Sequence, residues 1–135
     1  MKPFTLFLIL VFSLCVHACY YVQQSPKQNG KPDWFWRPNV EGKIGGVGVA
    51  GPHINGIGAQ RELAISRAIE DISRQMGVTV SSVSRTGTAG SKDGALTQME
   101  TYSIQTVTGQ TVRAKIREFW QEPETQKLYV WMVVE

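Results

Sequence analysis

Cysteine and histidine are scarce in this chain, which contains two of each among 135 residues. Cys15, His17 and Cys19 fall within five residues of one another near the N-terminus, and His53 stands alone in a segment rich in glycine and proline. A zinc site needs three or four ligands, and a disulfide framework needs several cysteines at regular spacing. The sequence therefore predicts no metal site and no cofactor, and it places His53 in a loop.

Long runs of like charge are also missing. The chain has 14 basic and 11 acidic residues, so its net charge is +3, or about +2 without Lys2. The basic residues are scattered, and no run of them would neutralise a row of phosphates. We therefore expect no nucleic-acid partner.

Residue patterns typical of catalysis are absent as well. No serine lies in a nucleophile-elbow motif, which places the serine between two glycines at a strand-to-helix turn. The acids Glu100, Glu118, Glu122 and Glu124 fall in predicted strands or turns with no visible pairing. The sequence therefore predicts that the protein is not an enzyme.

The longest apolar run, Phe4 to Val16, has thirteen residues, whereas a membrane-spanning helix needs roughly 20. Lys2 precedes this run and the small residue Ala18 follows it, which is the order of parts in a signal peptide. The ending at Ala18-Cys19 resembles the lipobox of bacterial lipoproteins, in which the cysteine becomes the acylated first residue. We therefore predict a lipoprotein signal peptide over residues 1–18 and lipid attachment at Cys19.

His17 departs from that lipobox, where a small or hydroxyl residue is commoner at the same position. The alternative is a secreted protein that keeps Cys19 as a buried thiol or is cut a residue or two away. If Cys19 is acylated, Cys15 leaves with the signal peptide. No disulfide can then form within the mature chain.

Residues 19–33 contain two prolines, a glycine and several amides, and they have little periodicity. This composition is typical of a flexible tether. Residues 34–135 then form one domain of about 100 residues, because a chain of this length has no room for a second.

Trp34, Phe35 and Trp36 form the most aromatic patch of the sequence. They could close over the core of a small domain, because aromatic side chains bury large areas. The alternatives are that they stack on a glycan or anchor a protein contact. The three residues are therefore candidate contact residues, and the sequence does not choose among these roles.

Gly46, Gly48 and Gly51 match the dinucleotide-binding pattern G-x-G-x-x-G. That site requires a helix to begin at the last glycine, but Pro52, His53 and Ile54 intervene. We therefore interpret these glycines as positions in a short strand that let a helix pack closely against it.

Apolar residues recur at helical spacing from about Gly58 to Met76. Asn55 or Gly58 is the predicted start, and Gly77 is the predicted C-terminal cap. On the polar side, the spacing of Glu70 and Arg74 favours a surface ion pair.

The remaining segments alternate in the manner of strands at residues 78–86, 98–108, 112–116 and 128–134, and a glycine-rich loop is predicted over 86–95. Both faces of the last strand are apolar, so we expect the helix to cover one face, and a partner subunit or the aromatic segment to cover the other. The predicted fold is α+β, with one long amphipathic helix packed on a mainly antiparallel sheet of three to five strands as an open sandwich.

Four stretches carry a family resemblance: PDWFWRPN, IGGVGVAG, AQRELAISRAIEDISRQMGVTVSS and VRAKIREFWQEPETQKLYVWMVV. Together they resemble the LPP-twenty family of bacterial outer-membrane lipoproteins, which includes the flagellar lipoprotein FlgP. The resemblance implies a helix across an antiparallel sheet, attachment to the outer membrane, and no catalytic residues.

We therefore expect a lipid-anchored envelope protein that faces the periplasm or the cell surface and acts through protein contacts. The expected partners are further copies of the chain and envelope or flagellar proteins, in an assembly associated with motility. The alternative is a module that binds cell-wall glycan (peptidoglycan) through Trp34 and Trp36.

Overall fold

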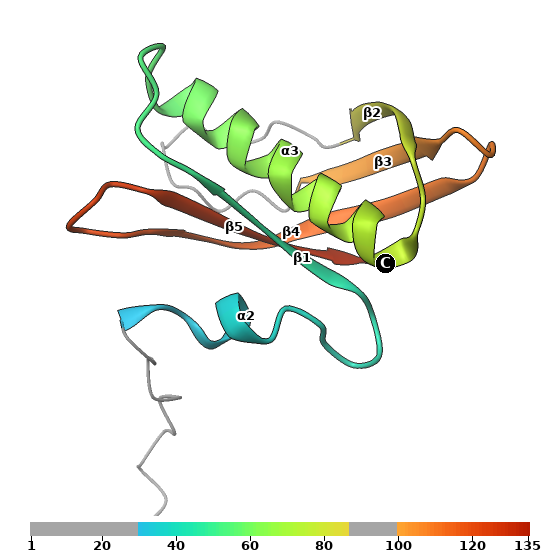
Figure 1. Cartoon of the computed structure of the whole chain (residues 1–135), viewed down its shortest axis with the longest axis horizontal. Helices are drawn as coiled ribbons and strands as arrows, with labels where there is room; N and C mark the ends of the chain where they lie inside the picture. Colours follow the sequence, from blue (N-terminus) through green and yellow to red (C-terminus); the bar gives the residue numbers. More distant parts are fainter. Residues whose placement is uncertain (1–29, 87–99) are drawn as a thin grey trace, which may run out of the picture.

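The computed structural model describes residues 30–86 and 100–135. The predicted signal peptide, Cys19, most of the predicted tether and most of the predicted loop over 86–95 lie outside these residues. The described chain forms a five-stranded antiparallel sheet, with helix α3 (Ile57–Met76) on one face and the short helix α2 (Asp33–Trp36) on the other (Figure 1). The predicted α+β fold is confirmed.

The strands are β1 (Gly45–Ala50), β2 (Val80–Thr86), β3 (Thr101–Thr106), β4 (Thr111–Gln121) and β5 (Leu128–Val134). Their order across the sheet is β1-β5-β4-β3-β2, and every neighbouring pair is antiparallel. Strands β2 to β5 therefore follow one another as a meander. Helix α3 carries the chain from β1, at one edge of the sheet, to β2 at the other.

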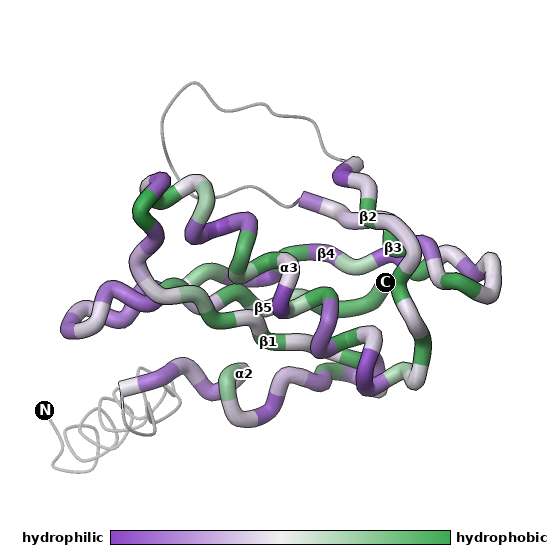
Figure 2. Tube along the Cα trace, turned by 45° about the horizontal axis from the view of Figure 1, so that its top comes forward, coloured by the Kyte–Doolittle hydropathy of each residue, from purple (hydrophilic) through white to green (hydrophobic). Residues whose placement is uncertain are grey.

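The predicted apolar stripe of α3 is buried against the sheet, as the helical spacing indicates. The buried positions of the stripe are Ala64, Ile65, Ala68, Ile69 and Ile72, and the facing strand residues include Ile104, Ile116, Val130 and Met132. Hydrophobic stretches accordingly alternate with hydrophilic ones along α3 in Figure 2, and the turn between β4 and β5 is hydrophilic. This layer between α3 and the sheet is the main core.

The two ends of α3 lie close to the predicted positions. Gly56, between the predicted starts Asn55 and Gly58, occupies the N-cap with a φ of 86°. Gly77 caps the C-terminus in the left-handed conformation, with a φ of 66°. Its N–H donates to the carbonyl of Arg74 at 3.2 Å, so an otherwise free helix-end acceptor is satisfied.

Glycines bring α3 unusually close to β1. A Cβ atom on Gly48 would lie 1.8 Å from the carbonyl oxygen of Ala64, and one on Gly46 would lie 2.5 Å from that of Ala68. Gly51, the third glycine of the pattern, has nothing within 4 Å of the same position. The interpretation of these glycines as a close helix–strand contact is therefore confirmed for Gly46 and Gly48.

Strand β4 contains a bulge that reverses which way its side chains point. Ile116 lies opposite Met132, but Glu118 lies opposite Trp131, so one extra residue is inserted between them. After the bulge, Trp120 lies opposite Tyr129 on the face away from α3. Without the extra residue, Trp120 would share the α3 side with Ile116.

Candidate functional site

Three of the four predicted site residues are described, and they form helix α2. Pro32 precedes this helix in an extended conformation, and Trp34, Phe35 and Trp36 complete its single turn. Figures 1 and 2 both place α2 on the side of the sheet away from α3. The fourth predicted site residue, Cys19, lies outside the described part of the chain.

Trp34 is a core residue. Its side chain is 7% exposed, and its ring stacks on that of Trp131 with 5.9 Å between centroids and 7° between planes. Trp131 is held in turn by a 2.8 Å hydrogen bond from its indole Nε1 to the carbonyl oxygen of Pro38. Because one face of the Trp34 indole lies on Trp131 and the residue is buried, it offers no open surface on which a sugar ring could stack.

The neighbouring aromatic residues extend this contact into a cluster. The Phe35 ring meets Trp36 edge-on at 4.8 Å and Tyr129 edge-on at 5.5 Å, and Trp120 lies 5.0 Å from Tyr129. The ammonium of Lys31 lies over Phe35 at 4.5 Å. We use the name aromatic cluster for the following six residues: Trp34, Phe35, Trp36, Trp120, Tyr129 and Trp131.

The aromatic cluster explains why the last strand is apolar on both faces. Tyr129 is 3% exposed, and α2 covers it from the side away from α3. The aromatic segment, one of the two predicted covers, therefore lies on this face of β5, so the strand's composition no longer indicates a partner subunit. Trp36 differs from Trp34, because 48% of its surface is exposed.

A second group of side chains, which the sequence did not indicate, is polar. Glu100, for which the sequence shows no pairing with another acid, is bound by basic and aromatic side chains. Its Oε1 lies 3.1 Å from a guanidinium nitrogen of Arg61, and its Oε2 accepts a 2.8 Å hydrogen bond from the Tyr102 hydroxyl. Arg85 lies 3.8 Å from both Glu100 and Glu62. We call these five residues the polar cluster.

The polar cluster joins elements that are distant in the sequence. Arg61 and Glu62 belong to α3, Arg85 to β2 and Tyr102 to β3, while Glu100 directly precedes β3. Both carboxylate oxygens of Glu100 are engaged, and the guanidinium of Arg61 also lies 4.8 Å from the ring centre of Phe119. A carboxylate held in this way links the helix to the far half of the sheet, because its partners come from α3 and from β3.

Tyr102 gives the polar cluster a pH dependence. Burial, together with the hydrogen bond to Glu100, raises the pKa of Tyr102 well above its ordinary value. Below about pH 10 the phenol is protonated in both states; at higher pH the unfolded chain loses this proton first. Folding stability should therefore fall as the pH rises above about 10, by up to about 1.4 kcal/mol per pH unit from this group.

Urea unfolding at a series of pH values from 8 to 12 measures this effect. Tyr102→Phe is the matched variant, because it keeps the ring and removes the ionising hydroxyl. We expect a shallower alkaline decline for the variant than for the native chain. Equal slopes would show that Tyr102 does not hold its proton in the folded state.

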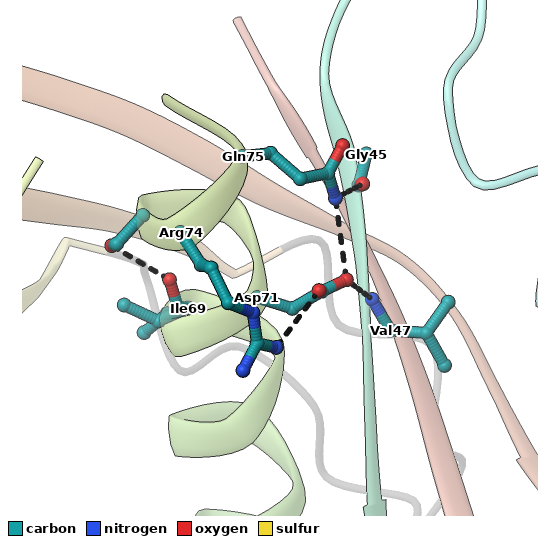
Figure 3. Close-up of polar contacts among 7 residues, drawn as sticks. Gly45, Val47, Ile69, Asp71, Arg74 and Gln75 are labelled. Carbon is teal, nitrogen blue, oxygen red and sulfur yellow. Dashed lines mark hydrogen bonds and ion pairs between the residues drawn. The ribbon is translucent and has the colours of Figure 1, made fainter. Parts of the chain in front are cut away.

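The two edges of the sheet differ. At β1, side chains of α3 bond to the strand's backbone: Asp71 accepts from the Val47 N–H at 3.1 Å, and Gln75 donates to the Gly45 carbonyl at 2.8 Å (Figure 3). Arg67 similarly donates to the carbonyl of Val49. The predicted pair of Glu70 with Arg74 is wrong, because Arg74 instead bonds Asp71 at 3.1 Å and so helps to hold it against β1.

At the other edge, β2 has no such cover within the described residues. Every residue of β2 after Val80 is exposed, and only β3 pairs with it there. A groove of about 490 Å³ separates β2 from α3, and its lining includes Ile69, Val80 and Val83. Val83 is 44% exposed on the wall of this groove. The described structure therefore has one sealed edge and one open edge.

His53 lies in the loop between β1 and α3, as predicted, where its Nδ1 accepts a 3.1 Å hydrogen bond from the Asn55 N–H. Residues 30–86 and 100–135 contain no group of three or more side chains suited to hold a metal ion. Within the same ranges, no helix is both long and apolar enough to cross a membrane.

Comparison with known proteins finds no matching family model, no matching curated protein and no matching solved structure. The resemblance to the LPP-twenty family therefore stands on its four sequence stretches alone.

Proposed function

We propose that this chain is a lipid-anchored protein of the bacterial envelope, acylated on Cys19, and that it acts through protein contacts. The apolar run of residues 4–16 followed by Ala18-Cys19 supports the anchor. The family resemblance supports the outer membrane as its site and an assembly associated with motility as its setting.

The main support for a protein-contact role is a difference between the two edge strands of the sheet. The outward backbone groups of β1 are hydrogen-bonded to side chains, whereas, within the described residues, those of β2 are not. Backbone groups along β1 are occupied by Arg67, Asp71 and Gln75, so this edge cannot accept another strand without losing those bonds. Within the described residues, β2 pairs with a strand on one side only, so the backbone N–H and C=O groups on its other side can bond to an added strand. A partly apolar groove lies beside it. An edge of this kind recruits partners by adding a strand, with main-chain bonds giving affinity and side-chain pockets giving specificity.

The residues of β2 are compatible with pairing to the β2 strand of a second copy of the chain. Two β2 strands paired antiparallel about Val83 would place Ser82 opposite Ser84 and Arg85 opposite Ser81. No like charges then face each other, and the two strands would continue both sheets into one of ten strands. Such isologous contacts are the commonest basis of homodimers.

Site-specific photo-crosslinking in the cells that make the protein tests this role. A photoreactive amino acid in place of Val83 should give an adduct of twice the chain mass, because Val83 lies at the centre of the proposed contact. Val107 is the matched control, since it is an exposed valine on the turn between β3 and β4. Equal labelling from both positions, or none from Val83, would count against β2 as a contact edge.

The substitution Cys19→Ser tests the lipid anchor and the motility setting. We expect the variant to lose its lipid and leave the membrane fraction, and a strain that makes only this variant should swim less well if the assembly serves motility. A native chain whose Cys19 carries a free thiol would remove the anchor from the proposal. Unchanged swimming would remove only the motility setting.

A further inference from the structure

The aromatic cluster has an exposed rim on the face of the sheet away from α3. Trp36 is 48% exposed, Phe35 beside it is half-buried, and Trp120, which contacts Tyr129, is also half-buried. Lys31 completes the rim, with its ammonium 4.5 Å from the centre of the Phe35 ring and 5.2 Å from that of Tyr129. The rim is therefore a small amphipathic surface in which indole and phenyl rings adjoin one cation.

The described chain begins at this rim. Gly30 is the first described residue, Lys31 follows it, and the chain then leads into α2 at Asp33. Eleven peptide units connect Gly30 to Cys19, so the acylated sulfur can lie no more than roughly 40 Å from Gly30 at full extension. The covalent link to the lipid thus enters the domain at the aromatic cluster, whereas α3 lies on the other side of the sheet.

The residue types of the rim suit the zone between lipid headgroups and acyl chains. Tryptophan is enriched there because its ring is apolar while its indole N–H can bond to water or headgroups. Lysine lays its apolar stem along such a surface and keeps the ammonium near the phosphates. Lys31 and Arg37 flank α2 with Asp33 as the one acid between them, so the segment carries a net positive charge.

We propose that the exposed rim of the aromatic cluster docks on the surface of the lipid bilayer and so orients the domain, with Trp36 at the level of the headgroups. This inference rests on the proposed lipid anchor. A short tether keeps the rim at an effective concentration of order millimolar near the membrane, so weak intrinsic affinity is sufficient. The docked orientation directs α3 and the groove beside β2 away from the membrane, where a protein partner can reach them.

Tryptophan fluorescence in vesicles that contain brominated phospholipid measures the docking. The native acylated chain is reconstituted into these vesicles and into unbrominated ones, and the emission of Trp36→Phe is subtracted to isolate Trp36. We expect the isolated Trp36 emission to be severalfold weaker in the brominated vesicles and shifted to the blue. As the control, Ile57→Trp in the Trp36→Phe background reports from an exposed position at the start of α3, and its added emission should change little.

Mass spectrometry of the same sample separates the two proposals. An acylated chain whose Trp36 emission is unaffected by bromine overturns the docking and leaves the anchor in place; this is also the result if the rim binds a protein or a glycan instead. A chain without the acyl group overturns the anchor and the docking together. Equal quenching at positions 36 and 57 shows that the domain has no fixed orientation, which again overturns the docking.

Discussion

Replacing Gly48 with alanine should lower the free energy of unfolding by about 3 kcal/mol or more, because an added methyl group has no space at this position. The new Cβ would lie 1.8 Å from the Ala64 carbonyl oxygen and 2.5 Å from the Ala68 nitrogen. Both are backbone atoms of α3, so no side-chain rotation can relieve the overlap, and the helix must move off β1. In a domain of about 100 residues, a loss of this size lowers the melting temperature by more than about 12 °C.

Thermal and urea unfolding of Gly48→Ala and Gly51→Ala, followed by circular dichroism, tests this expectation. Gly51 belongs to the same glycine pattern, but its added Cβ would meet nothing within 4 Å. Alanine there should be neutral or stabilise by up to about 1 kcal/mol, since it restricts the unfolded chain. Similar stabilities for the two variants would show that α3 does not depend on the missing side chain at position 48.

These glycines show which structural features a local sequence pattern can predict. The G-x-G-x-x-G pattern alone suits a nucleotide site, and the prolyl segment after Gly51 was enough to reject that role. The helical stripe that ends at Met76 and the cap at Gly77 were likewise readable, because the period of 3.6 residues and a left-handed terminal residue are local properties. Elements that depend on their own residues were therefore predictable.

The aromatic cluster depends on register, which local patterns do not show. Trp120 joins Tyr129 only because one extra residue in β4, between Ile116 and Glu118, turns the following side chains to the other face. The alternation of Val112, Ala114 and Ile116 does not indicate the bulge that follows them in the observed strand, Thr111–Gln121. A closer signal was available in the short turn between β4 and β5, which sets Trp120 and Tyr129 directly across the hairpin.

The polar cluster could not be predicted from the sequence, for a different reason. Glu100 and Glu118 look alike in the sequence, since each is an acid at or near a strand. Only the topology, which carries α3 from one sheet edge to the other, brings Arg61 to one of them and leaves the other exposed. Long-range pairing of this kind requires the fold to be known first.

Glu100→Ala should accordingly lower the free energy of unfolding by about 2–4 kcal/mol, whereas Glu118→Ala should change it by no more than about 0.5 kcal/mol. Removal of the Glu100 carboxylate leaves the largely buried guanidinium of Arg61 without its counter-charge and the Tyr102 hydroxyl without its acceptor. The loss stays below that of a fully buried ion pair because 21% of the Arg61 side chain remains exposed to water. Urea unfolding of the two variants measures the difference directly.

A double-mutant cycle shows whether Arg61 is the partner that matters. If the ion pair carries the effect, Arg61→Ala combined with Glu100→Ala should cost less than the sum of the single changes, by about 1 kcal/mol or more. Additive losses would assign the stability to Tyr102 or to the packing of Arg61 on Phe119 instead. Because the backbone of α3 lies closest to β1 and β5, loss of this link should also loosen β2 and β3 first. Hydrogen exchange at β2 and β3 should then rise more than at β1, and a uniform rise would show that the polar cluster does not serve as a separate link to that half of the sheet.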